Sequence, residues 1–329
     1  MKTGNASYSP SLLKQFRAEL SEWIHPEELG RRCNLKADEV QKLLTDFRLQ
    51  GYDIRSDQDR LRVAAEPIRL VPAEILLHSQ TEIIGNEVLV FEECDSTNDQ
   101  IWQWAGIPGK EGLVVFAEEQ TRGRGRLGRR WFSPKFHNLT FSILLQPPLS
   151  VEKAAVLTLA AGVAITECLR EEFEVSACLK WPNDVVVESR KIAGILVESK
   201  LIGKYPNFVV GIGLNVNIST SETPAQLKGK LTSMAMELER DYNRNFIAGR
   251  LLQSLDRWYR KLLYGQLDEI QARWRDLATD LDRWITLQSN GREYSGRILE
   301  INPLEGIILQ MPDGYVKVFR AEHTTIIST

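Results

Sequence analysis

The irregular alternation of strand-like and helical segments from residue 81 onward is the feature that most constrains the fold. Strand patterns occupy about 86–93, 112–119 and 138–145, and a helical pattern over about 150–173 is apolar on nearly all sides. Further strand patterns lie within 176–218, before helical residues 246–280. Because strands and helices do not alternate one for one, the pattern predicts an α+β fold rather than a doubly wound sheet. A helix that is apolar all round is expected at the centre.

The first 66 residues predict three short helices followed by a hairpin. Pro26 suits the first turn of the second helix, and a tight turn is expected at Asn34-Leu35. The third helix places Val40, Leu43, Leu44 and Phe47 on one face and stops at Gly51. Residues 52–65 alternate as a hairpin does, with its tip at 57–59. Together these elements predict a winged helix-turn-helix.

The last stretch, from about residue 282, predicts five short strands separated by Ser-Asn-Gly, Asn-Pro and Pro-Asp-Gly turns. Such a pattern is typical of a small β barrel. Pro67 and Pro72 bracket an expected linker. The predicted organisation is therefore a winged helix-turn-helix at 1–66, a linker at 67–80, a central mixed α/β domain at 81–281 and a barrel at 282–329.

Composition excludes several classes of protein. The 329 residues are 43% hydrophobic and 26% charged, with a net charge of −3, so no global attraction to nucleic acid is expected. The N-terminus lacks the apolar core of a secretory signal, and no apolar run reaches the ~20 residues of a membrane helix. The four cysteines are scattered without metal-ligand spacing. We expect a cytoplasmic protein with reduced thiols, no membrane association and no metal held by protein ligands alone.

The segment TRGRGRLGRRW, residues 121–131, holds five arginines and three glycines. Its glycine spacing matches the dinucleotide fingerprint, but that fingerprint requires a helix to begin at the turn, and here Pro134 and a strand follow. No Gly-Lys-Ser/Thr follows either, which argues against a P-loop. Two functional interpretations remain, namely a basic surface for nucleic acid and a loop that closes over a small anionic ligand; a merely solvated basic turn is the structural alternative.

A second positive cluster lies in KWPNDVVVESRKIAGIL, residues 180–196. Lys180 is expected at a strand end, Pro182 and Asn183 in a turn, and Lys191 and Gly194 on the return strand. A purely structural hairpin explains most of this pattern. Two positive clusters near Thr, Asn and Gln side chains nevertheless suit a reaction in which two anions must meet.

The ordered set of motifs resembles the biotin–protein ligases, specifically the bifunctional ligase/repressor (BirA) type. The motifs are STN at 96–98, Gln120, GRGRLGRRW at 123–131, KWPND at 180–184, KIAGIL at 191–196 and GIGLNVN at 211–217. They cover about residues 81–275, and the flanking regions agree with the same architecture. The resemblance implies a biotin/lipoate-ligase central domain and an SH3-like C-terminal barrel.

The resemblance also implies a reaction. Biotin and ATP, with Mg²⁺, form biotinyl-5′-adenylate, and the biotinyl group passes to one lysine of the biotin carboxyl carrier protein of acetyl-CoA carboxylase. Fixed cations are the main catalytic need when a carboxylate attacks a phosphate. By position, the catalytic residues are Lys180 and Arg126. The residues implied for biotin are Ser96, Thr97, Asn98, Gln120, Gly123, Arg124, Arg126, Lys180 and Gly194. Those implied for ATP and the adenylate are Arg126, Arg129, Trp131, Asn183, Lys191 and Asn215.

The resemblance further implies a biotin-responsive repressor that binds the operator of biotin synthesis genes as a ligand-linked homodimer. Lys36, Gln41 and Lys42 of the third helix are the candidate DNA contacts. Residues 1–66 hold eleven Lys/Arg and eleven Asp/Glu, however, so phosphate attraction is weak. Two alternatives therefore stay open. One is a DNA-binding biotin sensor without ligase activity, and the other is a ligase whose winged helix does not bind DNA.

Overall fold

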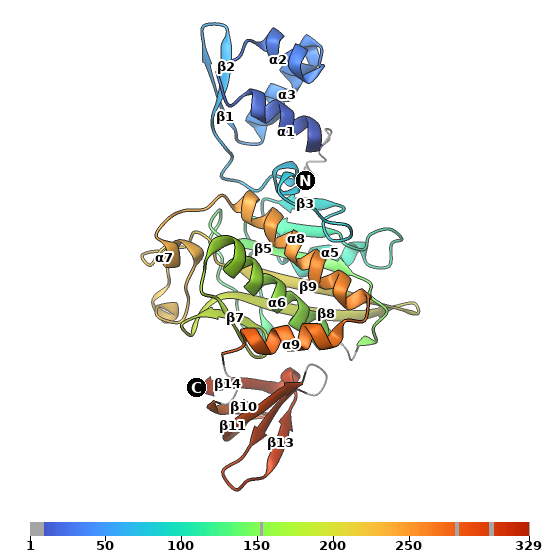
Figure 1. Ribbon diagram of the computed structural model, residues 1–329, viewed down its shortest axis with the longest axis vertical. Helices are drawn as coiled ribbons and strands as arrows, with labels where there is room; N and C mark the ends of the chain where they lie inside the picture. Colours follow the sequence, from blue (N-terminus) through green and yellow to red (C-terminus); the bar gives the residue numbers. More distant parts are fainter. Residues whose placement is uncertain (1–9, 152–153, 280–282, 303–305, 329) are drawn as a thin grey trace.

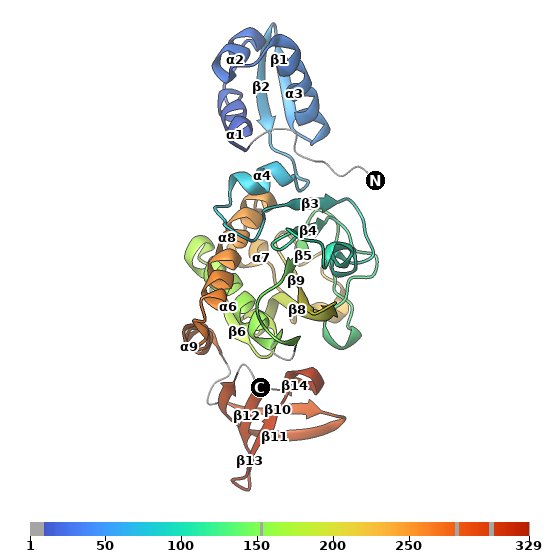
Figure 2. The same ribbon diagram turned by 90° about the vertical axis from the view of Figure 1, so that its right-hand side faces the viewer.

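The computed structural model describes residues 10–151, 154–279, 283–302 and 306–328. Three regions follow one another along the long axis of the molecule, with the N-terminal helices at one end and the C-terminal strands at the other (Figures 1 and 2). The central region is the largest and contains a seven-stranded sheet. No helix in the described ranges is long and apolar enough to cross a membrane.

The N-terminal region consists of three helices and a two-stranded hairpin, as the sequence predicts. The elements are α1 (Pro10–Glu19), α2 (Pro26–Cys33), α3 (Ala37–Leu49), β1 (Asp53–Asp57) and β2 (Arg60–Ala65). Asn34 adopts the left-handed conformation that ends α2, with φ of 55°, so the predicted turn is confirmed. The predicted apolar face of α3 is also confirmed, because Val40, Leu43, Leu44 and Phe47 are all buried. These side chains pack on Phe16 and Leu29 in a core separate from that of the sheet.

The segment expected as a linker contains a helix of its own. Helix α4 (Pro72–Leu77) contacts both α1 and α8 (Arg244–Leu263), and its Glu74 is buried. Glu74 accepts hydrogen bonds from Tyr52 and from Arg17, the latter at 2.7 Å. Helix α4 therefore connects the two cores rather than leaving the N-terminal region on a free tether. Helix α4 has only six residues, which are too few to show a helical period, so the sequence pattern did not reveal it.

The central sheet has the strand order β3-β4-β5-β9-β8-β7-β6, with only the β3–β4 pair parallel. Helices α6, α8 and α9 cover one of its faces (Figure 2). The predicted central helix is confirmed, since α6 is buried along most of its length. The strands are β3 (Val88–Phe91), β4 (Val114–Ala117), β5 (Leu139–Leu145), β6 (Cys178–Lys180), β7 (Asp184–Val187), β8 (Arg190–Ile202) and β9 (Tyr205–Leu214). The other helices are α5 (Thr97–Ile101), α6 (Ala154–Phe173), α7 (Met234–Leu238) and α9 (Leu267–Leu277).

The two faces of β9 have different functions. Ile212 and Leu214 belong to the core that α6 covers, whereas Gly211 and Gly213 point to the opposite face. This alternation follows from the two-residue period of a strand. The face that lacks the large helices is therefore where the sheet leaves room for a site.

The C-terminal region forms a five-stranded antiparallel sheet, so the five predicted strands are confirmed. They are β10 (Trp284–Ser289), β11 (Arg292–Asn302), β12 (Gly306–Gln310), β13 (Val316–Phe319) and β14 (Thr324–Ser328), in the order β13-β12-β11-β10-β14. Ile285, Leu287, Ile298 and Leu309 fill its interior. Strand β14 is the part of this region that meets the central domain's arginine loop, as described below.

Asp256 of α8 fixes the chain where it enters the central sheet. Its carboxylate accepts hydrogen bonds from the backbone amides of Ile83 and Ile84, both at 2.8 Å, and of Glu82 at 3.1 Å. A buried carboxylate that satisfies three amides is hard to replace, because each amide would lose its partner away from water.

We expect Asp256→Ala to lower the free energy of unfolding by about 2–4 kcal/mol, since it leaves three amides without an acceptor. Urea unfolding of the full chain measures this change. Asp241→Ala removes an exposed carboxylate just before α8 and is the matched control, with an expected change within about 0.5 kcal/mol. Equal effects of the two substitutions would contradict the anchoring role of Asp256.

Candidate active site

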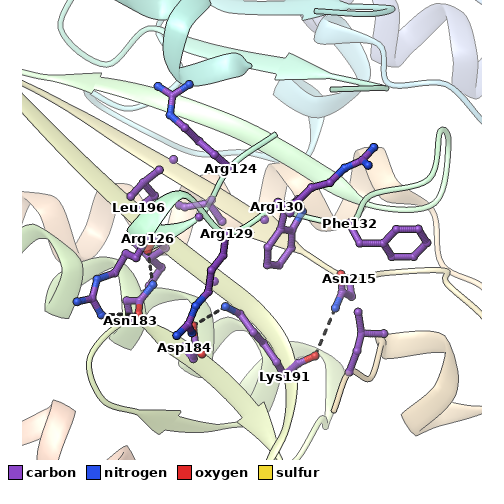
Figure 3. Close-up of a pocket in the computed structure, with 18 of the residues that line it drawn as sticks. Arg124, Arg126, Arg129, Arg130, Phe132, Asn183, Asp184, Lys191, Leu196 and Asn215 are labelled. Atoms are coloured by element: carbon purple, nitrogen blue, oxygen red, sulfur yellow. Dashed lines mark hydrogen bonds and ion pairs between the residues drawn. The ribbon is translucent and has the colours of Figure 1, made fainter. Parts of the chain in front are cut away.

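A cavity of about 600 Å³ opens on the face of the sheet that the large helices leave uncovered. Figure 3 shows side chains from the arginine loop, from the β6–β7 turn and from β8 converging on it. Strand β14 also reaches the rim through Thr325 and Ile326. The cavity thus combines segments that lie more than 200 residues apart in the chain.

The structure brings together the site residues predicted from the sequence, with one exception. Those lining the cavity are Ser96, Thr97, Asn98, Gln120, Arg124, Arg126, Arg129, Trp131, Lys180, Asn183, Lys191, Gly194 and Asn215. Gly123 is not among the described lining residues. Its carbonyl instead accepts a hydrogen bond from the Trp131 amide at 3.0 Å, and a Cβ there would lie 3.2 Å from the side chain of Gln120.

One end of the cavity is a buried network of uncharged polar groups. The Gln120 side-chain oxygen accepts a hydrogen bond from the Thr97 amide at 2.8 Å. Ser142 of β5 donates from its hydroxyl, which lies 2.7 Å from Thr97 Oγ1 and 2.5 Å from Asn98 Oδ1. Ser142 was missed in the sequence because it sits in the middle of a strand pattern. These groups can recognise a neutral polar head such as a urea.

The arginine loop is a closed hairpin rather than the start of a helix, so the sequence argument against a dinucleotide turn is confirmed. Gly125 donates from its amide to Arg129 O at 2.7 Å, and a 3₁₀ turn, η2, spans Arg126–Gly128. Leu127 and Gly128 have φ of 56° and 71°, the left-handed pair of a type I′ turn. Glycine is required at the second of these positions because L side chains are strained there.

Arg124 is held by two carboxylates. Its guanidinium donates to both oxygens of Asp99, at 2.6 and 2.7 Å, and lies 3.1 Å from Glu198 of β8. The hydrogen bond with Arg124 lowers the pKa of Asp99 and raises that of Arg124 itself. Glu198 also accepts a hydrogen bond from Asn98 at 2.9 Å. The first half of the loop is therefore fixed to α5 and β8, and much of its positive charge is neutralised.

Lys180 differs from these paired cations. It stands at the end of β6 and lines the cavity, yet its ammonium makes no ion pair or hydrogen bond within the described part of the chain. Lys191, by contrast, lies 2.6 Å from Asp184. Among these lysines, Lys180 is the one whose charge stays available to a bound anion.

Trp131 lies flat against the sheet at the other end of the cavity. A Cβ at Gly213 would come within 2.3 Å of its ring, and one at Gly194 within 3.1 Å. The Lys191 ammonium sits 5.4 Å above the same ring, and Asn215 lies nearby (Figure 3). The indole N–H is buried and has no acceptor among the described residues. The aromatic ring suits stacking against a planar ligand, and its buried N–H lies against Gly213.

The second half of the loop reaches the C-terminal sheet. Arg126 donates to the backbone carbonyl of Ala321 and lies 3.2 Å from Asn183 Oδ1 and 3.4 Å from Thr324 O. Arg129 lies 3.5 Å from Thr325 Oγ1. The C-terminal region therefore contributes its backbone to the rim of the cavity.

The fold and the cavity define a ligase that joins a small carboxylic acid to a protein. The model of the Biotin/lipoate A/B protein ligase family matches residues 90–215. The structure resembles a biotin protein ligase from Aquifex aeolicus in complex with biotin and ATP, with a TM-score of 0.64, 26% identity and coverage of 74% of this chain and 100% of that one.

Two curated relatives extend the comparison to nearly the full length. The bifunctional ligase/repressor BirA of Escherichia coli K12 is 30% identical over 292 residues, which cover 88% of this chain and 89% of the relative. BirA of Bacillus subtilis 168 is 25% identical over 313 residues, covering 94% and 96%. The chain belongs to the biotin–protein ligase family, in its bifunctional ligase/repressor branch.

We expect Gly213→Ala to weaken binding of the nucleotide about tenfold or more, because its Cβ occupies space that the Trp131 ring fills. Calorimetric titration with ATP measures this effect. The same substitution in a Trp131→Ala background should cost little more, since the ring it displaces is gone. Additive losses in the double variant would show that Gly213 does not act through Trp131.

Proposed function

We propose that this biotin–protein ligase uses MgATP to activate biotin as biotinyl-5′-adenylate and then transfers biotin to a lysine of the biotin carboxyl carrier protein of acetyl-CoA carboxylase. One observation carries the proposal: a single cavity is lined by the neutral polar Thr97 and Gln120, by the aromatic Trp131 and by Lys180, whose ammonium has no partner among the described residues. Biotin has a neutral ureido ring, which suits the neutral polar residues, and a carboxylate. ATP has a purine, which suits the aromatic residue, and phosphates. The biotin carboxylate and the phosphates are the two anions that a free cation can bind.

The reaction needs positive charge where two anions meet. A biotin carboxylate oxygen attacks the α-phosphorus of ATP, the bond to the bridging oxygen breaks, and pyrophosphate leaves. We assign Lys180 to this junction because a preorganised cation offsets the repulsion between carboxylate and phosphate. Arg126 is assigned as the second catalytic cation. In the second step the carrier lysine, as a neutral amine, attacks the carbonyl carbon, AMP leaves and the nitrogen loses a proton.

The biotin side is assigned to the neutral end of the cavity. Thr97, Asn98 and Gln120 would contact the ureido group. The assignment is supported by the burial of Thr97 and Asn98, by the hydrogen bond from the Thr97 amide to Gln120, and by Ser142, which lies within hydrogen-bond distance of both Thr97 and Asn98. Ser96 and Gly123 complete this side together with the backbone of the arginine loop. Gly194 is assigned to biotin at the border with the nucleotide side, because Trp131 and Lys191 lie directly against it. Arg124 contributes mainly by fixing that loop, because Asp99 and Glu198 already take its charge.

The nucleotide side is assigned to the aromatic end. Trp131 would cover the adenine with its ring. Lys191, Asn183 and Asn215 line the adjoining wall, and Arg129 would approach the phosphates. We also propose that residues 282–329 form an SH3-like barrel, whose strand β14 borders this side.

Intact-mass measurement tests the function directly. An apo carrier domain incubated with the protein, biotin and MgATP should gain the mass of one biotinyl group. No gain at saturating substrate would refute the proposal, whereas adenylate formation without transfer would leave only its first step.

Lys180→Ala should slow adenylate formation by about 10²–10³-fold, because one preorganised charge at the reacting oxygens is lost. Pyrophosphate release under single-turnover conditions reports this step. Lys204→Ala removes an exposed lysine from the β8–β9 turn and should leave the rate unchanged. Near-normal turnover of Lys180→Ala would mean that another group neutralises the junction.

We further propose that residues 1–66 form a winged helix-turn-helix that binds operator DNA as an adenylate-loaded homodimer. Residues 67–80 would connect it to a ligase domain at 81–281. The relatives' name, ligase/repressor, supports this role. Gln41 and Lys42 are exposed on α3, and Lys36 is exposed at its N-cap, as DNA contacts require. Glu39, an acidic residue of the same first turn, accepts a hydrogen bond from the Lys36 amide at 2.8 Å and thus serves as a helix cap.

Several basic side chains of this region already have partners. Arg31 and Arg32 bind Glu28, and Arg55 lies 3.1 Å from Asp53. Arg62 stacks 5.2 Å from the Trp23 ring. Few cations are therefore left for phosphate groups, and the affinity for DNA should fall less steeply with salt than that of a repressor with a strongly basic DNA-binding surface.

We expect a mobility-shift titration against promoter DNA of biotin synthesis genes to show specific retention only with biotin and ATP present. The slope of log affinity against log salt should be about −5 for a dimer, on the assumption of three phosphate contacts per protomer. Absence of retention at micromolar protein and low salt would favour the alternative of a ligase whose N-terminal region does not bind DNA.

A further inference from the structure

A buried ion pair lies between the linker and the central sheet. Arg244, the first residue of α8, and Glu118, which directly follows β4, have side chains that are 1% and 3% exposed. Arg244 Nη1 lies 2.7 Å from Glu118 Oε2. Removing two charges from water costs free energy that can exceed the free energy of their attraction. A buried ion pair is therefore stable only where hydrogen bonds satisfy its remaining donors and acceptors. The identity of those further partners therefore indicates what the pair holds in place.

On one side the pair holds the linker backbone. Arg244 Nη2 donates to Ile68 O at 2.7 Å, and Glu118 Oε1 accepts from the Leu70 amide. The neighbouring Asn245 accepts from the Val71 amide at 2.8 Å and donates to Arg69 O at 3.1 Å. Four successive linker residues are thus bound by the start of α8 and the end of β4.

On the other side the pair reaches the cavity through two asparagines. Arg244 Nη1 donates to Asn138 O at 2.9 Å. Asn138 donates to Asn215 Oδ1 at 3.2 Å and accepts from the Val216 amide at 3.1 Å. Asn215 in turn donates to Lys191 O at 3.3 Å, the contact drawn in Figure 3, and to Thr232 O at 3.0 Å. Asn215 and Lys191 both line the nucleotide side of the cavity.

We propose that Arg244 and Glu118 are positioning residues for the nucleotide side of the site, acting through Asn138 and Asn215, and that they couple that side to the linker. The proposal rests on the function proposed for the cavity. Neither residue touches the cavity, so their effect must pass through the asparagines. A fully buried network has little room to adjust, because each donor and acceptor has a fixed partner in a low-dielectric interior.

The coupling is reciprocal by thermodynamic necessity. If linker docking favours the arrangement of Asn138 and Asn215 that binds nucleotide, bound nucleotide must favour linker docking by the same factor. This arrangement gives the N-terminal region a physical means to respond to the occupied site.

Two conservative substitutions in the full chain test the proposal. Glu118→Gln keeps the shape of the side chain but leaves the Arg244 charge unpaired. Arg244→Lys keeps the charge near Glu118 but cannot span Glu118, Asn138 and Ile68 at once. Each should raise the KM and the calorimetric Kd for ATP about 2- to 30-fold, with the KM for biotin and kcat changed little. Using both variants keeps the test open if one of them fails to fold.

Glu167→Gln is the matched control. Glu167 of α6 is also buried, and it lies 2.8 Å from Arg257 and 2.5 Å from Arg273, on the helical side of the sheet. We expect this variant to lower Tm as the test variants do while leaving the ATP constants unchanged. Unchanged ATP constants in both test variants, or an equal rise in Glu167→Gln, would overturn the positioning role.

Hydrogen exchange of the linker amides distinguishes coupling from a purely structural role of the ion pair, because a purely structural role would not change the response of these amides to ligand. Biotin with ATP should slow exchange at the Leu70 and Val71 amides of the wild type, and Glu118→Gln should abolish that response. Equal slowing in the variant would overturn the coupling. If the wild type forms no adenylate, only the proposed function is refuted, because the Kd for ATP and the exchange response are measured without turnover. If the wild type binds no ATP, the proposed function and the positioning role are both refuted.

Discussion

The close contact of two side chains with the backbone of β9 is the constraint on which the rest of the site depends. A Cβ at Gly211 would come within 2.3 Å of Asn98 Oδ1, and one at Gly213 within 2.3 Å of the Trp131 ring. The same strand therefore forms the floor of both ends of the cavity, while Ile212 and Leu214 fill the core behind it. Because a strand alternates its faces, one short segment can serve both purposes.

The cations of the site differ in whether a carboxylate neutralises their charge. Arg124 and Lys191 have carboxylate partners within 3 Å, so they stabilise the architecture of the loop and of the hairpin. Lys180 has none among the described residues and lines the same cavity. A loop rich in arginine is thus less a uniform positive surface than a framework in which carboxylates neutralise some of the charges and leave others to the cavity. This distinction could not be seen from the net charge of the loop.

The sequence predicted most of the elements and the members of the site, because both depend on local patterns. Strand alternation located the central strands, and motif order placed Thr97, Gln120, Trp131 and Lys180 in one cavity. It did not reveal helix α4, which is too short to show a period, nor Ser142, which is hidden in a strand. The partners of Arg124 also escaped prediction. Glu198 lies 74 residues away in the chain, and only the folded sheet brings it close.

The two flanking regions are attached to the catalytic domain at different depths. The linker is held by a buried pair of opposite charges, Arg244 and Glu118. The C-terminal sheet is held nearer the surface, by Arg126, which donates to the carbonyls of Ala321 and Thr324, and by Arg275, which lies 2.6 Å from Glu300. Arg126 lines the cavity, so a bound ligand can contact it directly, whereas Arg244 does not line the cavity. The linker contact must therefore transmit any effect of the ligand through intact bonds.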